Sequence, residues 1–210
     1  MVYLFTYICK KITYMKKLNF LFIAIAAITL ASCGGSDKAA EKTTYSLDTE
    51  TSSLKWKGSK SAEYFHIGSV KFTEGSIDME GKNLVAGKFT IDMNSIVTED
   101  ETLPEDKKAL LTGHLKDTTF FFAAENPNVT VTVSGYENGK LDAVISVLGQ
   151  EMKQSIPVKV KSDAKKVTIN GKFDLDFAAL NLAGMQPDPE SGEKVLSVVS
   201  YELNLTLNKK

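Results

Sequence analysis

The chain has 210 residues with 25 basic and 26 acidic side chains, which give a formal net charge of −1. All of the basic residues are lysine, so the chain has no guanidinium groups for bidentate contacts with phosphate or guanine. This composition argues against DNA or RNA as a partner.

The first 32 residues have the pattern of a secretory signal peptide. Lys16 and Lys17 precede thirteen mostly apolar residues, 18–30, and small residues follow them. This apolar run is shorter than the roughly 20 residues that a membrane-spanning helix needs. No later run is as long, so the sequence predicts no second membrane anchor.

Cys33 stands at the end of a motif, Leu30-Ala31-Ser32-Cys33, that resembles the lipobox of bacterial lipoproteins. In such proteins the signal is removed before the cysteine and the new N-terminus is acylated. The resemblance implies lipid attachment at Cys33, anchoring to the membrane through acyl chains, and an extracytoplasmic location at the periplasmic face or the cell surface. The alternative is that Cys33 is an ordinary unpaired residue. Residues 33–43, small and charged, are expected to form a lipidated flexible tether.

Cysteine chemistry is not expected in the remaining domain. The only other cysteine, Cys9, lies before Met15, the expected start of translation. Disulfides, zinc–thiolate sites and cysteine nucleophiles are therefore excluded for residues 44–210.

Residues 44–210 are long enough for one hydrophobic core and show an alternation of period two, which is typical of half-buried strands. The alternating stripes are Leu54 and Trp56; Val70 and Phe72; Val85, Gly87, Phe89, Ile91 and Met93; Val129, Val131 and Val133; Leu141, Ala143, Ile145 and Val147; Ile156, Val158 and Val160; Val167, Ile169, Gly171, Phe173, Leu175 and Phe177; Val199, Tyr201, Leu203, Leu205 and Leu207.

Turn signals separate several of these stripes. They are Glu74-Gly75, Glu80-Gly81-Lys82, Glu137-Asn138-Gly139 and Asn170-Gly171. Asn138-Gly139 is the strongest, because a type I′ turn needs positive φ at both central positions. Eight or more strands in hairpin order predict an all-β fold, an antiparallel up-and-down meander that closes into a barrel.

One segment departs from the alternation and predicts a short helix. Thr102 is expected to be its N-cap, with Pro104 in the first turn and Glu105 completing a capping box. Leu110, Leu111, His114 and Leu115 follow at helical spacing. A second short helix or ordered loop is expected near residues 178–182.

Several segments of residues 44–210, taken in order, resemble the YceI-like family of lipid- or polyisoprenoid-binding proteins. The segments are Tyr45-Ser46-Leu47-Asp48 with Ser53-Leu54-Lys55-Trp56-Lys57-Gly58; His66-Ile67-Gly68 with Phe72, Gly75 and Ile77; the strand 87–96; and Leu111-Thr112-Gly113-His114-Leu115-Lys116-Asp117 with Phe120, Phe121, Phe122 and Pro127.

The chain departs from the family pattern in its C-terminal third. Residues 146–153 (SVLGQEMK) stand where members often have a TxxGVTK stretch, and residues 173–177 (FDLDF) stand where they often have an Arg-Asp pair. The resemblance implies an eight-stranded, lipocalin-like barrel that binds a polyprenyl chain or isoprenoid quinone. The divergence of the C-terminal third affects the expected identity of the ligand more than the expected fold.

The inward stripes supply the candidate ligand-binding residues, each of which has plain core packing as its alternative role. They are Trp56, Phe72, Phe89, Ile91, Phe121, Val131, Val133, Ile145, Val147, Phe173 and Leu203. Phe120–Phe122 are expected to lie in a strand, so at least one of them faces out of the core or into a cavity mouth.

The only two histidines, His66 and His114, are candidates for a polar pair near the barrel opening that orients a ligand head. The alternative is that each satisfies local backbone groups. No metal site is predicted, because two histidines without a carboxylate pattern are too few ligands for zinc.

The function expected from the sequence is transport or storage of a long apolar amphiphile in the barrel interior, without a cofactor. Asp174 and Asp176 alternate with apolar residues and are expected to face solvent, and no hydrolase or phosphate-loop motif is present, so no enzymatic activity is predicted. The alternatives are a structural or adhesion lipoprotein with a filled barrel, and a weak lipid hydrolase. A homodimer is also left open.

Met15 is expected to be the true start of translation, because a signal peptide that begins there has an ordinary length. Peptide mapping of the precursor, in cells blocked in signal cleavage, should find no peptide from residues 1–14. Peptides covering those residues would contradict the prediction.

Overall fold

A computed structural model describes residues 41–210. The signal peptide, Cys33 and all but the last residues of the predicted tether lie outside the described residues. The first strand begins at Lys42, two residues before the expected domain start at residue 44. Within residues 41–210, no helix has both the length and the apolar character needed to cross a membrane.

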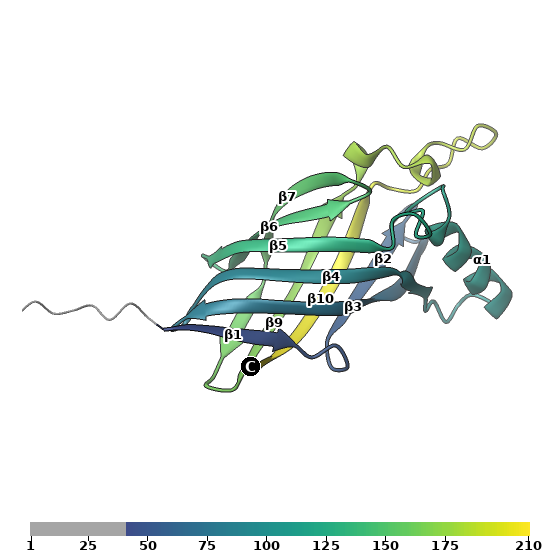
Figure 1. Ribbon diagram of the computed structural model, residues 1–210. Helices are drawn as coiled ribbons and strands as arrows, with labels where there is room; N and C mark the ends of the chain where they lie inside the picture. Colours follow the sequence, from purple (N-terminus) through teal and green to yellow (C-terminus); the bar gives the residue numbers. More distant parts are fainter. Residues whose placement is uncertain (1–40) are drawn as a thin grey trace, which may run out of the picture. The chain divides into compact units, whose positions relative to one another are not determined.

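Residues 41–210 form a strand-rich domain with one α-helix and two short 3₁₀ helices (Figure 1). The strands are β1 (Lys42–Leu47), β2 (Ser53–Ser59), β3 (Phe65–Glu80), β4 (Asn83–Thr98), β5 (Asn128–Glu137), β6 (Lys140–Val147), β7 (Gln150–Pro157), β8 (Lys159–Ser162), β9 (Lys166–Asp176) and β10 (Val198–Lys209). The helices are α1 (Glu105–Lys116), η1 (Ala178–Leu180) and η2 (Ala183–Met185).

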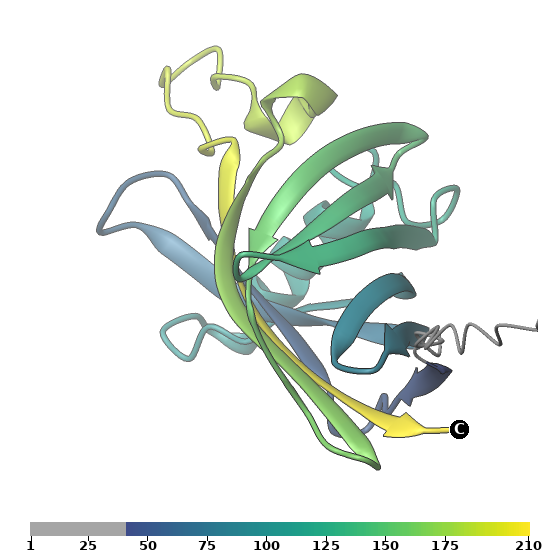
Figure 2. The same ribbon diagram turned by 90° about the vertical axis from the view of Figure 1, so that its left-hand side faces the viewer.

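These ten strands fill eight positions of an antiparallel up-and-down barrel. β1 and β2 share one position, since each pairs with both β3 and β10. β7 and β8 share another, since β7 pairs with β6 and β8 pairs with β9. From β3 to β6, and again from β8 to β10, each strand pairs with the next in the chain. The strands curl around a common axis (Figure 2). The all-β, lipocalin-like barrel with one α-helix is confirmed, and the strand count is ten because two positions are interrupted.

Each interruption has a local cause. Between β1 and β2, the Asp48 carboxylate accepts hydrogen bonds from the amides of Glu50 (3.1 Å) and Thr51 (3.2 Å), which turns the backbone out of the sheet. Between β7 and β8, Pro157 has no amide hydrogen to donate to a ladder. The next amide, on Val158, donates to the carbonyl of Gly139 (2.9 Å) at the end of β5 and β6. At this corner the chain therefore stops pairing with β6, through β7, and begins to pair with β9, through β8.

Two of the predicted turns are confirmed. Asn138 and Gly139 have φ of 51° and 80° between β5 and β6, as a type I′ turn requires, and Gly81 has φ of 61° between β3 and β4. A further turn of positive φ, at Leu148 (51°) and Gly149 (73°), joins β6 to β7 and was not predicted.

Two other predicted turns are wrong. Glu74-Gly75 lies within β3 and Asn170-Gly171 lies within β9. Both glycines mark close approaches instead. A Cβ at Gly75 would lie 2.4 Å from the ring of Phe89, and one at Gly171 would lie 2.5 Å from the Pro157 carbonyl oxygen.

The barrel is packed solid at the end where β1 begins. Six side chains with exposed fractions between 0 and 2% gather there: Ile77, Met79, Leu84, Val167, Ile169 and Leu207. Leu84 is buried in place of the predicted Val85, because the register shifts between Asp78 and Met79 and moves the inward face by one residue. These six side chains fill this end of the barrel.

The opposite end carries α1, η1 and η2 (Figure 1). The predicted capping box of α1 is wrong. Pro104 is the N-cap and no side chain caps the helix, and the Thr102 hydroxyl donates to Asp100 (2.6 Å) instead. The predicted short element near residue 178 is confirmed as η1.

Gly171→Ala should destabilise the barrel by about 1–3 kcal/mol, because the added methyl overlaps the Pro157 carbonyl at the corner where the barrel closes. The measurement is the free energy of unfolding in urea. Gly113→Ala in α1 is the control, since nothing lies within 4 Å of its added methyl, and it should stabilise by up to about 1 kcal/mol. Equal stability of the two variants would contradict this account.

Candidate functional site

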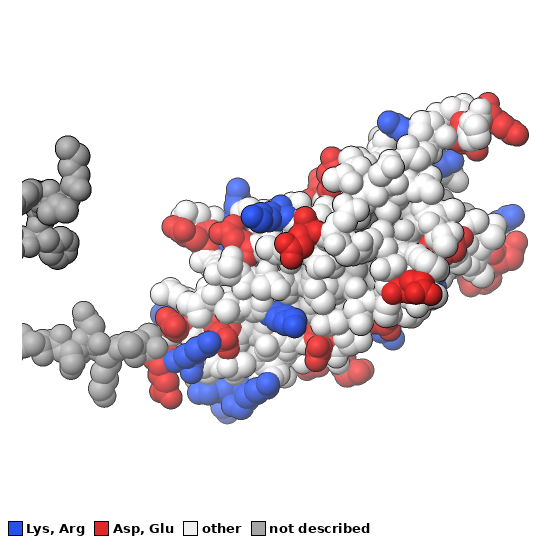
Figure 3. All heavy atoms as spheres, turned by 45° about the horizontal axis from the view of Figure 1, so that its top comes forward, with Lys and Arg blue, Asp and Glu red and all other residues white. Residues whose placement is uncertain are grey.

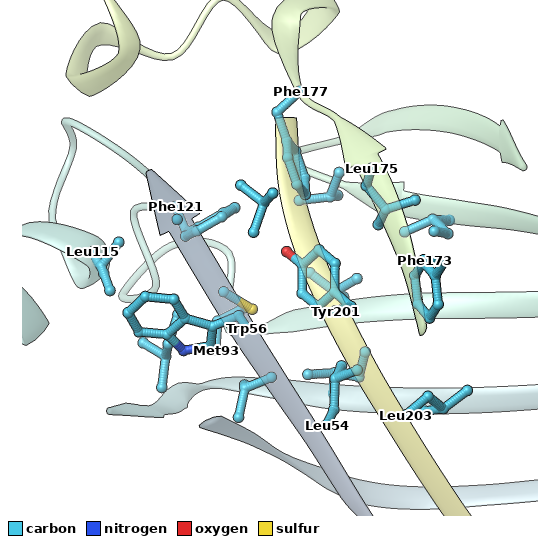
Figure 4. Close-up of a pocket in the computed structure, with 18 of the residues that line it drawn as sticks. Leu54, Trp56, Met93, Leu115, Phe121, Phe173, Leu175, Phe177, Tyr201 and Leu203 are labelled. Atoms are coloured by element: carbon cyan, nitrogen blue, oxygen red, sulfur yellow. The ribbon is translucent and has the colours of Figure 1, made fainter. Parts of the chain in front are cut away.

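The barrel encloses a cavity of about 340 Å³ that reaches the end covered by α1 (Figure 4). Its walls come from β2 to β7, β9 and β10, together with α1 and the segments that follow α1 and β9. Trp56, Phe121 and Tyr201 line the part of the cavity nearer to α1, and Leu141, Ile156 and Leu205 line the part farther from α1. The volume falls within the range of about 300–1,000 Å³ that is typical of small-molecule sites.

Twelve of the thirteen predicted ligand-binding residues line this cavity. They are Trp56, His66, Phe72, Phe89, Ile91, Phe121, Val131, Val133, Ile145, Val147, Phe173 and Leu203. The structure therefore brings them together, and their role in binding stays a prediction.

Further lining residues were not singled out from the sequence, among them Leu54, Met93, Leu115, Leu175, Phe177 and Tyr201. Leu175, Phe177 and Tyr201 share an alternating face with Phe173 or Leu203, so the alternation in the sequence could have identified them as lining residues. Leu115 comes from α1, whose position against the barrel no strand pattern reveals.

Aromatic rings form much of the cavity wall. Phe72 and Phe89 meet edge to face at 6.2 Å, Phe121 and Phe177 at 6.0 Å, and Phe173 stacks on Tyr201 at 5.6 Å. Such pairs add about 0.5–1.5 kcal/mol beyond their buried area. These contacts hold the walls in place around the space.

The position of the Trp56 indole ring requires that residue 68 has no side chain, as glycine provides. A Cβ at Gly68 would lie 2.4 Å from the indole ring and 1.9 Å from the Val97 carbonyl oxygen. The indole is 7% exposed, and its Nε1 has no hydrogen-bond partner among residues 41–210. As the single tryptophan of the chain, Trp56 is an internal reporter of the cavity.

The mouth of the cavity carries exposed aromatic and lysine side chains. Tyr64 and Phe65 are 53% and 38% exposed, and the Nζ of Lys57 lies 3.7 Å from the centre of the Phe65 ring. Lys60 forms an ion pair with Glu193 (3.1 Å), which ties the loop after β2 to the segment before β10. The polar groups of the site thus concentrate at its opening.

On the face drawn in Figure 3, lysine and acidic side chains are interspersed, so that face has no broad area of one sign.

His66 lies at the mouth and is held by Asp100. Its Nδ1 donates to a carboxylate oxygen of Asp100 at 2.8 Å, and the ring of Tyr64 packs edge-on at 5.2 Å. Asp100 is 6% exposed and also accepts from the amide (2.9 Å) and the hydroxyl of Thr102. The hydrogen bonds from Thr102, and then the one from His66, lower the pKa of Asp100 from 3.8 to about 2.

His114 does not share this position. It lies on α1 with its side chain 52% exposed, 3.4 Å from Asp117, and it does not line the cavity. The predicted pair of histidines at the opening is therefore wrong. Leu111 and Leu115 face the cavity from α1, whereas His114 lies at the edge of that helix face, where its side chain is exposed.

Phe120–Phe122 lie in turns after α1, and the prediction of a strand there is wrong. The amide of Phe122 donates to the Asp117 carbonyl (2.8 Å), and Phe122 has φ of 41°. Phe120 and Phe121 line the cavity, while Phe122 is 38% exposed. One ring of the three does face outward, as expected.

Metal ligands do not gather in the part of the chain that the structure describes. Within it, no group of three His, Cys, Asp or Glu side chains is placed to hold an ion. Asp174 and Asp176 are exposed, as predicted, and Asp174 accepts a hydrogen bond from the Ser200 hydroxyl (2.6 Å).

The sequence profile of the YceI-like domain matches residues 45–208. The chain belongs to the YceI-like domain family. The matched residues of this YceI-like protein include every strand that borders the cavity.

Two solved structures share the fold of this YceI-like protein. A polyisoprenoid-binding domain from Saccharophagus degradans, implicated in plant cell wall breakdown, is 18% identical with a TM-score of 0.61, over 82% of this chain and 99% of that one. BcnA from Burkholderia cenocepacia is 17% identical with a TM-score of 0.61, over 76% of this chain and 98% of its own. A search of curated proteins finds no match to the sequence.

Asp100 should give the protein a stability that depends on pH. Because the folded-state pKa of about 2 lies below 3.8, folding is stabilised above pH 4, and this contribution is lost as the pH falls through about 2. Asp100→Asn should lower the free energy of unfolding at neutral pH by on the order of 1 kcal/mol, and should flatten its decline between pH 4 and pH 2. Urea unfolding across that range measures both effects, and parallel profiles for the two proteins would refute the assignment.

Proposed function

We propose that this YceI-like protein is an extracytoplasmic, N-terminally acylated carrier that holds a long apolar amphiphile inside its barrel. The proposed ligand class is a polyisoprenoid or an isoprenoid quinone. The protein would transport or store that lipid without chemically changing it.

The observation that carries the proposal is the apolar cavity of about 340 Å³, whose lining residues reach the end of the barrel that carries α1. A barrel of about eight strands either fills its interior with side chains or keeps room for one small ligand. Here the end that holds Ile77, Met79 and Leu207 is filled, and the end that holds Trp56 and Tyr201 is not.

Burial of hydrocarbon supplies enough free energy for such binding. Each buried CH₂ contributes about 0.8 kcal/mol, so one five-carbon isoprene unit contributes on the order of 3–4 kcal/mol before the costs of ordering. A few units in contact with the cavity wall would give useful affinity without a charged clamp. This matches a wall built mainly from aliphatic and aromatic side chains.

The likeness to the Saccharophagus degradans domain supports the ligand class. That protein is described as polyisoprenoid-binding, and nearly its whole chain superposes on this one. At 18% identity the likeness concerns the fold, so the ligand of this chain is inferred from its own cavity together with that relative.

The proposed anchor at Cys33 fits the direction in which the chain enters the domain. β1 begins at Lys42 at the filled end of the barrel, opposite the mouth (Figure 1). An acylated tether joined there would leave the mouth uncovered by the chain's own N-terminal connection.

The two alternatives have less support. A structural lipoprotein with a filled barrel would have no cavity of this size. A lipid hydrolase would need a nucleophile within hydrogen-bond reach of a base. Among residues 41–210, the His66 ring bonds to Asp100 and no serine hydroxyl bonds to that ring, so the arrangement favours binding.

Ala143→Phe tests the proposal by filling the cavity from its wall. Ala143 is 5% exposed and lines the space, so a phenyl group there should occupy the volume that a lipid chain needs. Wild-type protein purified from its native host and extracted with organic solvent should yield a prenyl or acyl lipid by mass spectrometry, close to one per protein. Extracts of Ala143→Phe should contain much less.

Val144→Phe is the matched control, because Val144 is the next residue on β6 and faces away from the cavity. It should retain the lipid. A wild-type extract without lipid, or equal lipid in both variants, would overturn the carrier, whereas turnover of the lipid by the wild type would favour the hydrolase.

A further inference from the structure

The hydroxyl of Tyr201 is a polar group inside an apolar part of the cavity. Tyr201 lies on β10 opposite Trp56 of β2 and Phe173 of β9. Its ring projects among the lining side chains, and the residues drawn around its oxygen are apolar (Figure 4). His66 and Lys60, by contrast, lie at the mouth.

This hydroxyl has no partner in the part of the chain that the structure describes. The hydroxyls of Tyr45 and Tyr136, also partly buried, each donate to a backbone carbonyl at 3.3 Å, on Asp163 and Val158 respectively. No hydrogen bond of this kind is formed by Tyr201 to residues 41–210, and burial is the one cause that raises its pKa. A hydroxyl without a partner that lines an apolar cavity marks a place for an external polar atom, because that oxygen is accessible to whatever occupies the space.

The surroundings of Tyr201 fix both its direction and its charge. The ring stacks on Phe173 with 5.6 Å between ring centres and an interplanar angle of 19°, and the ring centre of Phe177 lies 6.4 Å away. Burial raises the pKa of the hydroxyl above its ordinary value of 10.0, so it stays a neutral O–H donor throughout the physiological range.

We propose that the Tyr201 hydroxyl binds a neutral oxygen of the ligand, of carbonyl, ether or hydroxyl type, inside the barrel below the mouth. This inference rests on the proposed lipid-binding function and narrows its ligand class. The ligand is then an amphiphile whose uncharged oxygen enters the cavity, rather than a pure hydrocarbon.

A charged head group does not fit at this position. A carboxylate or phosphate beside Tyr201 would lose its hydration among Phe173, Phe177 and Leu203, and no cationic side chain lies there to compensate. The lysine and histidine that could pair with an anion, Lys60 and His66, lie at the opening. The cavity therefore selects for an uncharged oxygen.

Tyr201→Phe removes this oxygen and keeps the ring, so it separates the hydrogen bond from packing. The probes are a long-chain methyl ketone and the n-alkane of the same length, each titrated while the emission of Trp56 is followed. The substitution should weaken ketone binding about tenfold, which corresponds to about 1.4 kcal/mol, and should leave alkane binding unchanged.

Tyr136→Phe is the matched control, because the Tyr136 hydroxyl already bonds to the Val158 carbonyl and Tyr136 does not line the cavity. It should leave both affinities unchanged. An isotope-labelled ketone gives a second readout, since a hydrogen bond from Tyr201 should lower its carbonyl stretching frequency in the wild type relative to Tyr201→Phe.

The outcomes separate this inference from the function on which it rests. If both probes bind and Tyr201→Phe changes neither the ketone affinity nor the carbonyl frequency, the role of Tyr201 is wrong and the lipid carrier stands. If neither probe binds to the wild type, the carrier and this inference both fail.

Discussion

The structure depends on a mismatch between the width of an eight-position barrel and the side chains that fill it. The number of strands fixes the width, so the inward residues decide whether the interior is solid or hollow. Around Met79, Ile77 and Leu207 the side chains are almost completely buried and none of the three lines the cavity. Toward α1 they do not, although aromatic rings contribute to the wall.

This asymmetry gives the barrel a closed end and an open end. The closed end holds the largest fully buried side chains of the described residues, and none of these lines the cavity. The open end is held by contacts around its circumference, such as the Phe173–Tyr201 stack and the pair of His66 with Asp100. The side chains that stabilise the fold and those that line the cavity therefore lie in different parts of one sheet. The barrel can keep its cavity because the closed end stabilises the fold.

The strands and most of the cavity wall could be predicted from the sequence because they depend on alternation, which is a local signal. The hairpin at Asn138-Gly139 is equally local, since positive φ favours those two residues. The stripes that gave Phe89, Ile145 and Leu203 point inward in the structure, and all three line the cavity.

The errors arise where distant residues decide the outcome. Gly75 and Gly171 were taken for turns, but each is a glycine because another strand approaches it closely, through Phe89 and Pro157 respectively. The position of His114 depends on how α1 packs, and the merging of ten strands into eight positions depends on their pairing with β3, β6, β9 and β10. The Tyr201 hydroxyl was missed because its lack of a partner appears only in three dimensions.

Trp56 allows the central claim, that a lipid chain occupies the hollow end of the barrel, to be measured directly. It is the only tryptophan in the chain and lies in the cavity wall. The most direct measurement is quenching of its fluorescence by a long-chain lipid that carries bromine atoms along the chain. The account predicts strong quenching that saturates at a stoichiometric amount of lipid and is reversed by excess unlabelled lipid. Unquenched emission in the presence of bound lipid would place the chain outside the barrel and would contradict the account.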